Sequence, residues 1–459
     1  MMTLGMTYSV CRVCRRLVPA KVVAEDGKVY FEKFCATHGQ DRSLVYGDAE
    51  QYLRAQRFVK PGWVPLESFG ESSRPCPEGC GLCSRHEQHL CMPIVEITSR
   101  CNLACPVCLV SAGQPWDMTR AQFRGLLDGI IRAEKQVDVL NLSGGEPLLH
   151  PELLPLVDDA LARPEVVRVS ISTNGLRFLS DRALLESLRD RHVVICLQFD
   201  GFKESTYELL RGRRLLDEKL RILALLDEAG VSASLTMTAA GGVNDDQFRP
   251  MLDYLFAHEN LVSMMVQPVA FAGRGAALAG RMGRLTVPDV VRALGEAQHP
   301  AVSASDFLPL PCSHPLCFSL AFYIVLGEGR AVSITRLTDV EEVLDAVSNR
   351  LFFGLDRSDQ ARLCEMVYRL WSGPAALAPD SAEVLAVIRA MLRDVSATDF
   401  DPRKLFCTAE RRVKSIFIHA FQDADTFDLA RVRRCCNAYP QPDGRLVPAC
   451  VHNVLRRRP

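Results

Sequence analysis

Three closely spaced cysteines constrain what this chain can fold into more than any other feature of its sequence. They form a C-x3-C-x2-C motif made of Cys101, Cys105 and Cys108. Soft thiolate ligands favour iron–sulfur clusters, and one loop with three thiolates can bind three irons of a [4Fe–4S] cluster. The fourth iron then has no protein ligand and is open to a small molecule. A zinc knuckle and three buried free thiols are the alternatives for this spacing taken alone.

A second motif further along the chain favours the cluster. It is a turn made of Gly144, Gly145, Glu146 and Pro147. Glycine lets a backbone approach a ligand closely, and the Glu146 carboxylate can pair with the ammonium group of a bound amino acid. We therefore expect a molecule with an amino-acid end to be held between this turn and the open iron.

The composition is that of an ordinary globular protein with many cysteines. The chain has 459 residues, of which 48% are hydrophobic and 24% charged, and its net charge is −1. We expect two or three domains and no nucleic-acid partner. No signal peptide precedes Cys11, and no apolar run reaches the roughly 18 residues that span a bilayer. We expect a cytoplasmic protein without a transmembrane segment, whose 18 cysteines serve metals rather than disulfides.

Strands and helices alternate along the middle of the chain. Short apolar runs predict strands at 93–98, 137–142, 166–172, 192–199, 231–238 and 261–269. The segments between and after them predict helices at 120–135, 152–161, 181–189, 219–229, 245–257 and 287–296. Such βαβ repetition predicts an α/β fold, and these units are fewer than the eight of a closed TIM barrel. We therefore predict a partial (β/α)6 TIM-type barrel.

The alternation and the positions of the cysteines together predict four regions of the chain. Residues 1–45 are predicted to form a mononuclear metal module, and 46–92 a linker with an auxiliary [4Fe–4S] segment. Residues 93–300 form the partial barrel. Residues 301–459 lose the alternation, and we predict a separate C-terminal module for an auxiliary cluster and substrate.

Two further ligand sets precede the barrel. The first consists of Cys76, Cys80, Cys83 and Cys91. Four thiolates in one short segment complete a [4Fe–4S] cluster without an open iron, and a four-cysteine zinc site is the alternative. The second consists of Cys11, Cys14, Cys35 and His38. Three sulfurs and one imidazole suit a mononuclear tetrahedral site for zinc or a rubredoxin-like iron.

The C-terminal region contributes the last set, Cys312, Cys317, Cys436 and Cys450. We expect two cysteines from each end of this region to meet at another cluster, with Cys435 or Cys436 spare. Buried free thiols are the alternative. Cys196 and Cys364 lie in a strand-like and a helix-like segment, and we predict that both are core residues.

The two leading motifs resemble those of radical SAM enzymes. The cysteine loop of that family matches Cys101, Cys105 and Cys108, with Val107 where the family has an aromatic residue. The resemblance implies a [4Fe–4S] cluster that binds S-adenosyl-L-methionine (SAM) and cleaves it to a 5′-deoxyadenosyl radical. It also implies an electron donor such as flavodoxin or ferredoxin. Residues that follow the next strands are implied to line the SAM pocket, namely Ser172, Asn174 and Asp200.

The order of all the cysteine motifs is similar to that of a narrower group, which contains archaeal tetraether lipid synthase and a 7,8-dihydro-6-hydroxymethylpterin dimethyltransferase. This resemblance implies hydrogen abstraction from an unactivated carbon and one or two auxiliary [4Fe–4S] clusters. We expect C–C bond formation on lipid alkyl chains, with transient membrane contact, and the apolar segments 307–310 and 318–325 give this mild support. Radical methylation of a pterin, a non-catalytic electron carrier and a zinc-binding interaction module are the alternatives.

Overall fold

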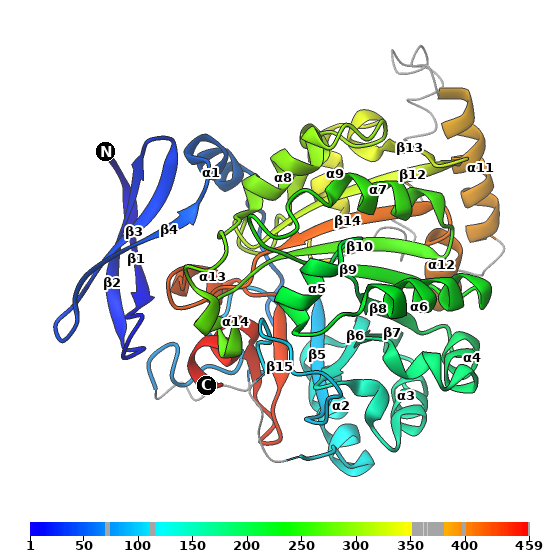
Figure 1. Cartoon of the computed structure of the whole chain (residues 1–459), viewed down its shortest axis with the longest axis horizontal. Helices are drawn as coiled ribbons and strands as arrows, with labels where there is room; N and C mark the ends of the chain where they lie inside the picture. The colour runs from blue at the N-terminus through cyan, green and yellow to red at the C-terminus, as the bar shows by residue number, and fades with distance from the viewer. Residues whose placement is uncertain are drawn as a thin grey trace.

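The protein is built on two β-sheets of different size (Figure 1). The computed structural model describes residues 1–68, 74–110, 115–350, 361, 365, 381–396 and 401–457. The smaller sheet is antiparallel and N-terminal. The larger sheet has twelve strands and contains the parallel core.

The small sheet forms from consecutive hairpins. Its strands are β1 (Met2–Val10), β2 (Leu17–Glu25), β3 (Lys28–Cys35) and β4 (Gly39–Tyr46), paired in that order. Asp26 and Gly27 join β2 to β3 with φ angles of 49° and 73°, the left-handed pair that a tight hairpin needs. The other two turns carry the predicted ligands Cys11, Cys14 and His38, and Cys35 ends β3. Helix α1 (Ala49–Ala55) follows the sheet.

The predicted strands of the barrel are confirmed. They are β5 (Met92–Thr98), β6 (Val137–Gly144), β7 (Val166–Thr173), β8 (Val194–Gln198), β9 (Ala233–Ala239) and β10 (Leu261–Pro268). Each pairs in parallel with the next, and their side chains are largely buried. Burial on both faces explains why these segments read as apolar runs rather than as alternating patterns. The α/β partial barrel predicted from the sequence is therefore present.

The predicted helices of the barrel are confirmed as well. They are α2 (Arg120–Glu134), α3 (Leu153–Leu161), α4 (Arg182–Asp190), α6 (Leu216–Glu228), α7 (Phe248–Ala257) and α8 (Val287–Glu296). In Figure 1, α3, α4 and α6 follow one another along one side of the strands. Sequence analysis missed α5 (Glu204–Arg211), a short helix between β8 and α6.

Residues 301–459, predicted to form a separate module, add strands to the barrel sheet in this structure. Strand β14 (Val413–His419) pairs in parallel with β10, and β15 (Asn437–Pro440) pairs in parallel with β5 at the opposite edge. Figure 1 shows the C-terminal strands, in orange and red, beside both ends of the barrel sheet. An open barrel leaves two edges with unpaired backbone groups, and these strands cover them. The sheet continues through β11 (Leu308–Pro309), β12 (Phe318–Gly327), β13 (Arg330–Ser333) and β16 (Leu446–Pro448).

This arrangement also explains the apolar segments of the C-terminal region. Residues 318–325 lie in β12, between β11 and β14, and Phe318, Phe322 and Ile324 are buried in a hydrophobic cluster. Their hydrophobicity serves core packing, so it no longer supports a lipid substrate.

The remaining elements are short or peripheral. They are the helices α9 (Val340–Ala346), α11 (Ser381–Ser396), α12 (Pro402–Ala409), α13 (Leu429–Arg433) and α14 (Ala449–Val451). Single turns of tighter or wider helix lie at Gln56–Phe58, Pro147–Leu149, Leu176–Leu179, Gly273–Leu278, Ala304–Asp306, Ile334–Arg336 and His452–Arg456. Cys364 lies outside the described residues. Among the helices that the structure describes, none combines the length and the hydropathy that a membrane crossing requires.

Candidate active site and metal centres

The cysteine loop and the Gly-Gly-Glu turn meet at the carboxyl ends of β5 and β6. Backbone hydrogen bonds join Gly145 N to Thr98 O at 2.8 Å and Glu146 N to Arg100 O at 2.6 Å. A Cβ atom on Gly144 would overlap the Thr98 carbonyl oxygen, and one on Gly145 would overlap that of Arg100. Only glycine permits this approach. The turn therefore fixes the backbone that leads directly into Cys101.

The three thiols of the loop lie in one electrostatic environment. Burial, together with the nearby Glu146, Cys105 and Cys108, raises the pKa of the Cys101 thiol to about 11. A metal ion is the natural counter-charge that deprotonates such thiols. Sulfur ligands grouped on one loop fit the [4Fe–4S] cluster that the spacing predicts.

The Glu146 carboxylate is buried and hydrogen-bonded inside the protein. Its side chain is 2% exposed, and its carboxylate accepts hydrogen bonds from the Leu148 and Asn174 backbone N–H groups and from the Thr173 hydroxyl. The carboxylate is occupied internally in this structure, and its pairing with a ligand's ammonium group stays a prediction. Glu146 ties the end of β6 to the end of β7. Pro147 begins the short helical turn that follows.

The other predicted SAM-pocket residues also lie at or just after the carboxyl ends of barrel strands, an edge called the rim below. They differ in whether their polar groups are free to bind a ligand. The Asn174 amide donates to Asn102 Oδ1 at 2.7 Å and so braces the cysteine loop. Ser172 is half-buried and donates to Asn141 Oδ1 at 3.1 Å. Asp200 is fully buried, and Arg211 Nη2 and Nε donate to its two oxygens at 2.6 and 2.7 Å. Its carboxylate is occupied inside the protein rather than free for a ligand.

Two positively charged side chains at this rim, those of Arg211 and Lys219, were not predicted from the sequence. Arg211, at the end of α5, also hydrogen-bonds the Cys105 thiol. Lys219, on α6, is fully buried and donates from Nζ to the carbonyl oxygens of Asn174 and Gln198, both at 2.7 Å. No spacing motif marks either residue, because each reaches the rim from a helix whose position depends on the barrel.

The buried Lys219 predicts a pH effect on stability. Burial lowers the pKa of Lys219 to about 7 from the ordinary 10.5. The unfolded chain thus holds a proton that the folded chain releases, so this residue makes the folded state more stable as pH rises from 7 toward 10.5. Between pH 7 and 9, we expect the metal-free protein to gain up to about 2.7 kcal/mol relative to Lys219→Met. Urea unfolding of both proteins measures this, and parallel pH profiles would contradict it.

The predicted N-terminal ligands converge. The ligand atoms of Cys11, Cys14, Cys35 and His38 all lie within 4.8 Å of one another. The Cys14 and Cys35 sulfurs are 3.9 Å apart, and His38 Nδ1 is 3.5 Å from the sulfurs of Cys11 and Cys35. Metal–sulfur bonds of about 2.3 Å give tetrahedral edges of nearly this length. A cavity of about 160 Å³ adjoins the four residues. The set fits a single metal ion.

The other cysteines group differently from the prediction. Cys76, Cys80 and Cys83 lie together, and hydrogen bonding from Cys80 lowers the pKa of Cys76 to about 6. Cys91, predicted to be their fourth partner, instead contacts Cys312 and Cys436, and these two contacts with burial raise its pKa. In this structure Cys91 thus lies with Cys312 and Cys436, and the quartet of Cys76, Cys80, Cys83 and Cys91 stays a prediction.

The predicted C-terminal quartet stays a prediction. Cys312, Cys317 and Cys436 lie with Cys91 in one buried cluster, and Arg431 Nε donates to the Cys317 sulfur at 3.2 Å. The Arg431 guanidinium faces Cys450 as well. Burial, followed by the nearby Cys450, Cys436 and Cys317, raises the pKa of Cys435. Cys436 lies near Cys91 and also near Cys317 and Cys435, so which of Cys435 and Cys436 is spare stays open. Cys196, predicted to be a core residue, is half-buried on β8.

Comparisons with known proteins agree with this geometry. Residues 95–255 match the Radical SAM superfamily, and residues 3–47 match the HMPTM N-terminal zinc ribbon domain. The chain is 28% identical to 7,8-dihydro-6-hydroxymethylpterin dimethyltransferase of Methanocaldococcus jannaschii, over 98% of this chain and 94% of that protein. It is 33% identical to mycofactocin maturase MftC of Mycobacterium tuberculosis, over 36% of this chain and 44% of that one.

A solved structure, that of Streptococcus suis SuiB bound to S-adenosylmethionine, has a TM-score of 0.34 and 16% sequence identity to the chain. The match covers 40% of this chain and 41% of that one. The matched sequence family, the parallel barrel and the joined motifs lead to one assignment. The chain is an enzyme of the radical SAM superfamily.

Proposed function

We propose that this enzyme holds a [4Fe–4S] cluster on Cys101, Cys105 and Cys108, binds SAM beside it, and forms a C–C bond at an unactivated carbon. The observation that carries the proposal is the close fit of the Gly144–Gly145 turn against the backbone that enters the cysteine loop. When bound and reduced, the cluster supplies the electron that cleaves SAM to a 5′-deoxyadenosyl radical. The chain's own residues bind and orient SAM and exclude water.

The arrangement of the rim suggests how SAM is oriented. Because Glu146 is occupied internally, the half-buried backbone of Ser143 to Gly145 is the part of the turn that remains accessible to an ammonium group. Asn174 braces the cysteine loop through Asn102. Arg211 supplies positive charge beside Cys105, held in place by Asp200.

Two auxiliary [4Fe–4S] clusters complete the proposal. One is held by Cys76, Cys80 and Cys83, and the second by Cys91, Cys312 and Cys436. Burial and mutual contact of the thiols support both sites. The N-terminal set of Cys11, Cys14, Cys35 and His38 holds zinc, which the matched zinc ribbon domain favours over iron.

The first substrate candidate is a pterin that receives a methyl group. The support is the dimethyltransferase of M. jannaschii, which aligns with nearly the whole chain. The second candidate is a lipid alkyl chain. Trp63, Val64 and Leu66 are 58%, 64% and 58% exposed on the segment after α1, an apolar surface suited to transient membrane contact. An electron donor such as flavodoxin or ferredoxin and a cytoplasmic location belong to the same proposal.

Anaerobic assay of the reconstituted full chain tests the proposal. We expect reductant-dependent release of 5′-deoxyadenosine from SAM, with about twelve irons and one zinc per chain. Mass spectrometry of pterin and lipid extracts from an anaerobic host that expresses the protein selects the substrate. Methylated pterins support the first candidate, and coupled or extended alkyl chains the second. Intact clusters without any 5′-deoxyadenosine would overturn the proposed reaction.

A further inference from the structure

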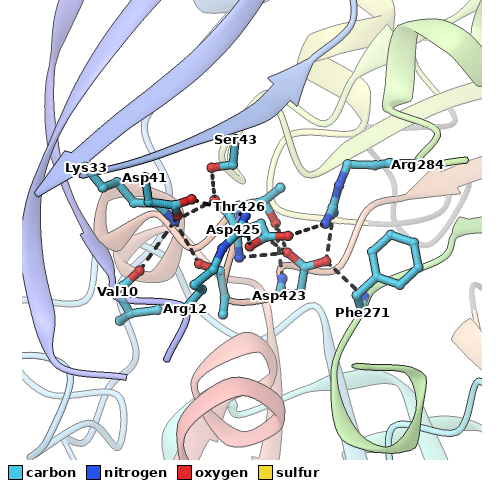
Figure 2. A network of polar contacts seen from close by, with 11 residues as sticks. Val10, Arg12, Lys33, Asp41, Ser43, Phe271, Arg284, Asp423, Asp425 and Thr426 are labelled. Carbon is cyan, nitrogen blue, oxygen red and sulfur yellow. Dashed lines mark hydrogen bonds and ion pairs between the residues drawn. The ribbon is translucent and has the colours of Figure 1, made fainter. Parts of the chain in front are cut away.

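The N-terminal sheet is fastened to the barrel by a buried lysine. Lys33, on β3, is 3% exposed and donates from Nζ to the carbonyl oxygens of Ala424 and Asp425, both at 3.1 Å. Its Nζ also lies 3.3 Å from Asp41 Oδ2. The Ser43 hydroxyl donates to the Asp425 carbonyl at 2.7 Å. Figure 2 shows these groups around the segment that follows β14.

Two residues next to the proposed zinc ligands, Arg12 and Asp41, take part in this contact between the N-terminal sheet and the barrel. Arg12 lies between the ligands Cys11 and Cys14, and its Nη2 is 3.2 Å from Asp41 Oδ1 and 3.1 Å from Asp425 Oδ1. Asp41 lies on β4, which begins directly after His38. A metal ion that orders the two ligand turns therefore also orders Arg12 and Asp41 against Asp425.

Asp423 continues the connection into the barrel. It is fully buried, and its Oδ1 accepts from the Asp425 and Thr426 backbone N–H groups, both at 3.1 Å. Its Oδ2 accepts from Phe271 N at 2.9 Å and pairs with Arg284 Nη1 at 2.7 Å. Arg284 also reaches Asp425, at 3.1 Å (Figure 2). Asp423 thus links the segment at Asp425, which contacts the N-terminal sheet, to the turn that follows β10 and contains Phe271.

That turn lies directly on the cysteine loop. Arg274 N donates to the Cys108 carbonyl at 3.0 Å. Gly273 has φ +53°, and a Cβ atom there would overlap the carbonyl oxygen of Leu109. The backbone of 271–274 is therefore packed against the last ligand of the loop, and Asp423 holds the start of that turn through Phe271.

We infer that Asp423 and Arg284 are positioning residues that couple the N-terminal metal site to the Cys108 end of the catalytic loop. The inference rests on the proposed function, because it takes Cys108 as a cluster ligand and SAM as the molecule bound beside it. The N-terminal ribbon, residues 3–47, thus takes a role in this reaction. With its metal bound, the ribbon keeps the cysteine loop in the geometry that binds SAM. Neither residue touches the reacting atoms.

The test compares Asp423→Asn with a ribbon variant that loses its metal, Cys35→Ala. We expect each to raise the SAM concentration for half-maximal 5′-deoxyadenosine release about tenfold, with a smaller change in the maximal rate. We expect the pair combined to be no worse than the stronger single variant, since both interrupt one connection. Thr7→Val is the matched control. It also removes a ribbon–barrel hydrogen bond, from Thr7 to Asp428 at 2.6 Å, but one that does not lead to Phe271.

A spectroscopic measurement separates positioning from a general loss of stability. The SAM-induced change in the electron paramagnetic resonance spectrum of the reduced enzyme should need more SAM in Asp423→Asn than in the wild type or in Thr7→Val. Equal SAM dependence in all proteins, or an equal loss in Thr7→Val, overturns the inference. A wild-type enzyme that releases no 5′-deoxyadenosine overturns the proposed function instead, so the two failures are distinguishable.

Discussion

The Cys105→Ala variant is expected to lose reductant-dependent SAM cleavage by at least about a thousandfold, which corresponds to roughly 4 kcal/mol in the activation barrier. The loss follows because a loop with three thiolates leaves no spare ligand for the catalytic cluster. Cys105 is also the thiol that Arg211 contacts, so its removal leaves that buried guanidinium without one of its partners. High-performance liquid chromatography of 5′-deoxyadenosine under anaerobic conditions measures the effect.

The control for this variant is Cys196→Ala. Cys196 is a half-buried residue of β8, away from the three-cysteine loop in sequence. We expect it to retain SAM cleavage within a few-fold. Zinc and the auxiliary irons should stay bound to Cys105→Ala. Loss of every metal at once would show that this cysteine is needed for folding, against the catalytic assignment.

Asp200→Ala is expected to cost about 3–5 kcal/mol in the free energy of unfolding, the range for one partner removed from a buried ion pair. The Asp200 and Arg211 side chains are 0% and 9% exposed, and the carboxylate also accepts from Thr238 N at 3.0 Å. Without it, the guanidinium stays buried and uncompensated. Urea unfolding of the metal-free protein measures the loss.

A matched carboxylate nearby provides the comparison. Asp246 pairs with Lys203 at the surface, where the two side chains are 56% and 47% exposed. Solvent screens such a pair, so Asp246→Ala should cost no more than about 1 kcal/mol. The double variant Asp200→Leu with Arg211→Met should recover part of the stability that Asp200→Ala loses, because it removes both buried charges. Equal costs for Asp200→Ala and Asp246→Ala would contradict the structural role given to Asp200.

The local pattern of the chain was sufficient to predict the barrel and the convergence of four N-terminal side chains that can ligate a metal. Apolar runs of strand length predicted β5 to β10, because a strand buried on both faces needs apolar side chains throughout. The ligands Cys11, Cys14, Cys35 and His38 were predictable because consecutive hairpins bring two adjacent turns together. In both cases, residues near in sequence become neighbours in space.

The grouping of the auxiliary cysteines needed the tertiary structure. Sequence proximity placed Cys91 with Cys83, but β15 pairs with β5 so that Asn437 lies opposite Met92. The Cys91 N–H donates to the Cys436 carbonyl at 2.9 Å, and the two thiols meet as a result. A strand pairing between residues so distant in the chain has no local signature.

By itself, then, the sequence determined the fold class and indicated the cysteine loop and its glycine turn, because each depends on patterns within short segments. Only the tertiary structure decided that Glu146 and Asp200 are occupied inside the protein, that Arg211 and Lys219 reach the rim, and that Asp423 joins the ribbon to the loop. The reason is physical: a side chain's partners depend on which distant elements pack against it, and burial makes those partners obligatory.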